Sequence, residues 1–193
     1  MLTLEQLHEV IHDNNEWMQA AQGSERNENA YLIIHNIPDY ENGGFQGIVM
    51  YLSSERKGTD AIYACHDGNT IPWTALQRYS PTFSHCFPYT PGELMTNLPE
   101  IIRDRKIVCY GMKHSVIPLR NWLANHGDRY EMAGQMIDVK EDAKRVLGIL
   151  PDYQLDTVLK ACGIDPYDFA IDELGTLMKI KAVYETLEKI KAV

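Results

Sequence analysis

The sequence predicts an α/β fold with a mixed five-stranded sheet flanked by helices, and three observations support this. Three apolar runs, Tyr31–Ile34, Gly47–Leu52 and Asp60–Cys65, follow one another with only polar connections between them, as in antiparallel hairpins. Two later runs, Lys106–Tyr110 and Met136–Ile137, alternate with helical patterns, as in βα units. The composition is that of a globular domain, with 193 residues of which 45% are hydrophobic and 23% charged.

The N-terminal segment predicts an added helix. Thr3 and Gln6 form a capping-box pattern, an apolar stripe follows, and residues 22–29 are polar and read as a linker. We therefore divide the chain into an N-terminal helix with linker, residues 1–28, and one main domain, residues 29–193.

Net charge and apolar runs limit the kinds of partner. The formal net charge of −9 gives no long-range attraction to nucleic acid, but it suits a small carboxylate metal site or a basic protein partner. No apolar run approaches the ~20 residues of a membrane helix, and the N-terminus has no signal-peptide pattern. We expect a cytoplasmic protein without a membrane segment. The four cysteines lack any Cys-x-x-Cys spacing.

The segment from Asp67 to Pro91 is rich in proline and aromatic residues. It predicts one short helix over Trp73–Arg78 and otherwise a long loop. Trp73 and Tyr79 are candidates to stack on nucleic-acid bases, or alternatively to pack as a local core over the sheet edge.

Two helices are predicted around the fourth strand. Thr90 and Glu93 form a capping box that begins the first of them. Gly111 turns the chain from the strand Lys106–Tyr110 into the second, which ends near Gly127.

Three further helices are predicted in the last third of the chain. Val139–Leu147 carries an apolar stripe and is stopped by Gly148. Leu155–Cys162 carries a second stripe, and Gly163 supplies the left-handed residue typical of a helix end. The last helix has one apolar face, formed by Leu174, Leu177, Ile180, Tyr184 and Leu187.

Short motifs in this last third resemble the C-terminal half of the DEDD-type (DnaQ-like) 3′–5′ exonuclease family. They are Ile137-Asp138, the segment Leu150-Pro151-Asp152-Tyr153-Gln154-Leu155, and Gly163-Ile164. The order of strands and helices also resembles the ribonuclease-H-like fold of that family. The resemblance implies phosphodiester hydrolysis by two divalent ions, Mg²⁺ or Mn²⁺, roughly 4 Å apart and held by carboxylates.

The catalytic motifs of that family are degenerate here. Where the resemblance implies Asp-x-Glu on the first strand, this chain has His35 and Ile37, and isoleucine cannot hold a metal. The family's acidic residue after the fourth strand also has no counterpart, because residues 111–126 contain no carboxylate. The two-metal site is therefore expected to be largely lost.

An alternative set of carboxylates could keep the site active. Asp39 and Glu41 have the Asp-x-Glu spacing, which points both side chains the same way along an extended chain. Asp172 and Glu173 begin the last helix. These four residues would be catalytic, with Asp39, Glu41 and Asp172 as metal ligands. The plainer interpretation is a polar turn and the first turn of a helix.

We considered a zinc site formed by Cys65-His66 and His85-Cys86, although neighbouring residues on a strand point to opposite faces. The leading expectation is a non-catalytic module without a cofactor. It would bind a protein or single-stranded nucleic acid through the old cleft, with Trp73, Tyr79 and His114 as binding residues. The alternative is an active exonuclease of single-stranded DNA or RNA that uses Mg²⁺ or Mn²⁺.

Overall fold

The computed structural model describes residues 31–39, 44–53, 61–66, 73–78, 85–90, 93, 96–98, 101, 105–125 and 136–192. The predicted N-terminal helix and linker lie outside these residues, as do Glu41 and Tyr79. No helix in the described part is both long and apolar enough to span a bilayer.

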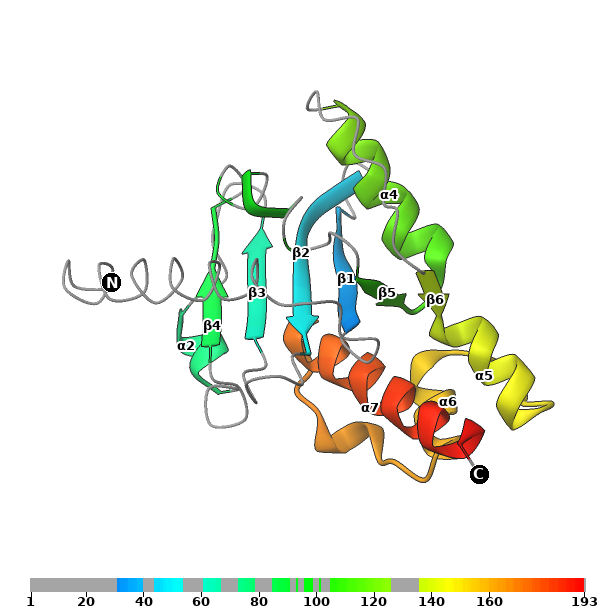
Figure 1. The fold of residues 1–193 in the computed structure, drawn as a ribbon. Coiled ribbons are helices and arrows are strands. Elements are labelled where there is room, and N and C mark those ends of the chain that lie inside the picture. Colours follow the sequence, from blue (N-terminus) through cyan, green and yellow to red (C-terminus); the bar gives the residue numbers. More distant parts are fainter. Residues whose placement is uncertain are drawn as a thin grey trace.

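The described strands form one mixed sheet of six strands in the order β4-β3-β2-β1-β5-β6 (Figure 1). β1, β2 and β3 are antiparallel neighbours, whereas β5 runs parallel to β1 and β6 parallel to β5. The strands are β1 Tyr31–Asp39, β2 Gly44–Leu52, β3 Ala61–His66, β4 His85–Pro88, β5 Lys106–Cys109 and β6 Met136–Asp138.

All five predicted strands are confirmed, and the sixth, β4, falls in the segment predicted to be mainly loop. β4 pairs in parallel with β3, with Ala61 opposite His85. It has four residues and ends at Pro88, so it is too short to show a period of two in the sequence. Proline is tolerated in such an outer strand because its missing N–H leaves no bond unmade on the open side.

The helices agree with the sequence patterns. Thr90 and Glu93 form the predicted capping box, in which the Glu93 carboxylate accepts from the Thr90 backbone N–H at 2.8 Å. Gly163 has φ of +77° and ends α6 as predicted. The elements are α2 Trp73–Gln77, α4 Met112–Asn125, α5 Val139–Leu147, α6 Leu155–Ala161, the 3₁₀ helix η1 Pro166–Asp168 and α7 Glu173–Lys191.

Alternation along β1 divides the core between the two faces of the sheet. Leu32 and Ile34 belong to the cluster that includes Val116 of α4. Ile33 and Ile37 belong to the other cluster, which contains the inward side chains of α5, α6 and α7. All four β1 side chains are buried. Because successive residues on a strand point to opposite faces, the sheet is covered on both sides.

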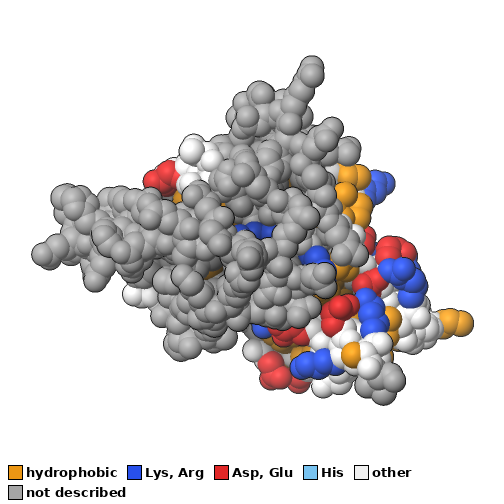
Figure 2. Space-filling view, viewed as in Figure 1, with side chains coloured by type: hydrophobic (Ala, Val, Ile, Leu, Met, Phe, Trp, Pro, Cys, Tyr) orange, Lys and Arg blue, Asp and Glu red, His pale blue; other side chains and the backbone are white. Residues whose placement is uncertain are grey.

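Ion pairs tie the C-terminal helices together. The buried Asp142 carboxylate of α5 bonds the Lys191 ammonium at the end of α7 at 2.6 Å, and it also pairs with Arg145. Lys179 of α7 bonds Asp156 of α6 at 2.8 Å. Figure 2 shows acidic and basic side chains intermingled over this part of the molecule. Charges of both signs therefore neutralise one another over these helices.

Candidate functional site

Three parallel strands reach the same edge of the sheet, where open α/β sheets commonly bind ligands. Ile34 of β1 pairs with Cys109 of β5, and Cys109 pairs with Asp138 of β6. β5 and β6 end at this level, whereas β1 continues through His35 to Asp39. We call this edge, with the adjoining first turns of α4 and α7, the carboxyl-edge site.

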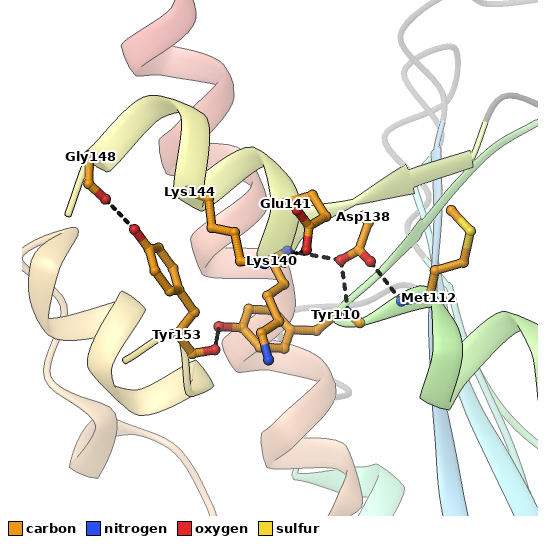
Figure 3. A network of polar contacts seen from close by, with 9 residues as sticks. Tyr110, Met112, Asp138, Lys140, Glu141, Lys144, Gly148 and Tyr153 are labelled. Carbon is orange, nitrogen blue, oxygen red and sulfur yellow. Dashed lines mark hydrogen bonds and ion pairs between the residues drawn. The ribbon is translucent and has the colours of Figure 1, made fainter. Parts of the chain in front are cut away.

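Asp138 caps two helices at once (Figure 3). One carboxylate oxygen accepts from the Gly111 N–H at 2.9 Å and from the Lys140 N–H at 3.0 Å, and the other accepts from the Met112 N–H at 2.7 Å. The carboxylate therefore serves the start of α5 and the start of α4 together. Its lone pairs are directed at backbone donors, which makes Asp138 a structural anchor of the edge.

Asn36 joins β1 to the beginning of α4. It is 7% exposed, and its amide donates to the Ser115 carbonyl and, at 3.4 Å, to the His114 carbonyl. The His114 side chain itself is exposed on the first turn of α4. The predicted binding residue His114 thus lies at the carboxyl-edge site on the α4 side.

His35 lies at the carboxyl-edge site on the other face of the sheet. It stands on β1 between Ile33 and Ile37, both of which pack against the α5–α7 side. Burial lowers the pKa of His35 from 6.5 to about 4, although the nearby negative charge of Glu173 acts to raise it. The imidazole is therefore neutral at neutral pH. The fold brings His35 and Glu173 together from distant parts of the chain.

Asp172 is engaged at the start of α7. One carboxylate oxygen accepts from the Gly175 N–H at 2.6 Å as the N-cap, and the other receives Arg78 Nη1 at 3.1 Å. Glu173, the next residue, is exposed in the first turn. The ion pair to Arg78 also places the end of α2, which begins at the predicted binding residue Trp73, beside the start of α7.

The predicted carboxylate quartet is described only in part. Asp39 is the last residue of β1 and pairs with Gly44, but its side chain is not described, and Glu41 lies outside the described residues. The side chain of Trp73 is likewise not described. Within the described part of the chain, no group of three His, Cys, Asp or Glu side chains could hold a metal ion.

The sheet register argues against the zinc alternative. Cys65 lies in the core cluster on the α4 face, whereas Cys86 lies in the cluster on the α7 face. Cys86 is opposite Ile62, three residues before Cys65. The two thiols are thus on opposite sides of the sheet and cannot share one ion, so that interpretation is wrong for this cysteine pair.

Three contacts at the site were not predicted from the sequence, two made by Asp138 and one by Asp172. The capping role of Asp138 has a local signal, since aspartate directly before a helical stripe is a typical N-cap, but its bonds to Gly111 and Met112 have none. The ion pair of Arg78 with Asp172 joins segments far apart in the chain.

Comparison with known proteins adds no assignment: no protein-family model and no curated protein matches this chain.

Proposed function

We propose that the chain is a divergent member of the DEDD-type exonuclease group whose two-metal site is largely lost. It acts as a non-catalytic binding module for a protein or a nucleic acid. The carboxyl-edge site is the part of the molecule that would carry out this binding.

The strand arrangement supports the fold half of the proposal. When the outer strand β4 is set aside, the order β3-β2-β1-β5-β6 remains, with three antiparallel strands followed by two parallel ones. Helix α4 packs on one face and α5–α7 pack on the other. This is the arrangement that a ribonuclease-H-like domain requires.

The environment of His35 is the main support for the loss of the two-metal site. In a two-metal nuclease, the side chains of β1 that face the last helix must be carboxylates, because Mg²⁺ takes oxygen ligands. Here those positions hold a neutral, half-buried imidazole and, at Ile37, an isoleucine that is 4% exposed. The carboxylate oxygens of Asp172, the N-cap of α7, contact the Gly175 N–H and the Arg78 guanidinium.

The test is an exonuclease assay with end-labelled single-stranded DNA and RNA in Mg²⁺ and in Mn²⁺. We expect no metal-dependent degradation, and no increase in melting temperature when Mn²⁺ is added, because metal binding to the folded state would raise it. Degradation that disappears in Glu41→Gln or Glu173→Gln, but persists in the matched control Glu141→Gln, would establish the active alternative. Glu141 is an exposed acid on α5 that pairs with Lys144.

A further inference from the structure

Residues 165–173, between α6 and the first turn of α7, form a short connecting segment that we call the ledge. It contains four carboxylates, Asp165, Asp168, Asp172 and Glu173, and no lysine or arginine. It adjoins the carboxyl-edge site because Glu173 lies near His35.

The ledge displays apolar side chains to solvent. Tyr167 is 86% exposed and Ile171 is 102% exposed, whereas Pro166 is buried and Phe169 is half-buried. Scattered single apolar residues on a surface are ordinary, but here two large ones protrude from the same short segment.

The ledge is also held in place. The Asp165 carboxylate accepts from the Tyr167 N–H at 3.0 Å, and Phe169 packs against the core. Gly175 of α7 packs so closely that a Cβ there would lie 1.9 Å from the Ala170 carbonyl oxygen. A surface that is already fixed loses little conformational entropy when a partner binds.

The charge of the ledge differs from that of the helices around it. Five acids elsewhere in α5, α6 and α7 pair with a lysine or arginine: Glu141, Asp142, Asp156, Glu185 and Glu188. In the ledge Asp172 pairs with Arg78, but Asp165, Asp168 and Glu173 form no ion pair with any described residue. Within the described part of the chain, three of the four ledge carboxylates therefore have no ion-pair partner, and they lie in the same short segment as the exposed Tyr167 and Ile171.

We propose that the ledge binds a basic polypeptide segment, with lysine or arginine facing the three carboxylates and an apolar residue packed on Tyr167 and Ile171. This inference rests on the proposed binding function and names its partner class as protein. Nucleic acid is disfavoured at this surface because its phosphates would face unpaired carboxylates.

The experiment selects short random peptides on the immobilised full chain and measures synthetic copies by fluorescence anisotropy. We expect enriched peptides with at least two basic residues beside an apolar one, and an affinity that weakens with salt. Tyr167→Ser with Ile171→Ser should weaken binding by about tenfold or more, as loss of an exposed apolar anchor does. Asp168→Asn with Glu173→Gln should weaken it and reduce the salt dependence.

The matched control is Ile149→Ser with Glu141→Gln, which removes an equally exposed isoleucine and an exposed acid elsewhere. It should bind like the unaltered chain, and all variants should melt at similar temperatures. The proposal would be overturned if basic peptides were not enriched, or if the control lost as much affinity as the ledge variants. It would also be overturned if the ledge variants kept their affinity, or if single-stranded DNA displaced the peptide in a way that depended on the ledge. The exonuclease assay tests the loss of catalysis separately. Peptide binding by the ledge and the loss of nuclease activity can therefore each be disproved without the other.

Discussion

Protonation of His35 should make the folded protein less stable in mild acid. Burial lowers the pKa of His35 to about 4 from its ordinary 6.5. Between these pH values His35 is therefore protonated in the unfolded chain and neutral in the folded chain. Stability is full above pH 6.5, falls as the pH falls from 6.5 to 4, and changes no further below 4 on this account. From pH 7.5 to 5.0 the two pKa values give a loss of about 2 kcal/mol in the free energy of unfolding.

Urea unfolding at pH 7.5 and pH 5.0 measures this loss, and comparison with His35→Gln isolates it, because glutamine does not titrate. With a slope of about 2 kcal/mol per molar urea, the unaltered chain should lose roughly 1 M more in its midpoint than the variant does. His114→Gln is the matched control, since it removes an exposed histidine near the same site and should keep the full pH-dependent loss. Equal losses in the unaltered chain and in His35→Gln would refute a lowered pKa of His35 in the folded protein.

Three other substitutions test individual contacts, two of them at the carboxyl-edge site and one, at Tyr31, at the start of β1. Asp138→Asn keeps the shape but turns an amide donor toward a backbone N–H, and should lower the free energy of unfolding by about 3 kcal/mol in urea titrations. Gly175→Ala should lower the melting temperature by several degrees, because its Cβ would overlap the Ala170 carbonyl, whereas alanine usually stabilises a helix interior. Tyr31→Phe removes the 2.6 Å bond to Glu185 and should cost about 1 kcal/mol in the same titrations. If Asp138→Asn or Tyr31→Phe were as stable as the unaltered chain, the hydrogen bond that it removes would be contradicted, and an equally stable Gly175→Ala would contradict the close approach to Ala170.

Local signals were sufficient for the last third of the chain. Val139–Leu147 is a helix because its apolar residues recur every three or four positions between an aspartate cap and Gly148. Gly163 ends α6 because only a residue without a Cβ adopts φ of +77° without strain. Such features depend on neighbouring residues, so the sequence alone is enough to place them.

The edge strand β4 was missed because it lacks such local signals. His85–Pro88 has no period that four residues could display, and it becomes a strand by pairing with β3. Parallel pairing between separate segments leaves little mark on the local sequence.

Local sequence patterns were enough to predict the α/β class, the five main strands and the C-terminal helices, and they show that His35, Ile37 and residues 111–126 supply no carboxylate. Three features depend on the folded arrangement: His35 lies near Glu173, Asp138 caps α4 as well as α5, and Cys65 and Cys86 lie on opposite faces of the sheet. The two kinds of feature differ in how far apart along the chain the interacting residues lie. Helix caps and apolar stripes are set by residues within a turn or two, whereas a site is formed by side chains that meet only after distant strands have paired.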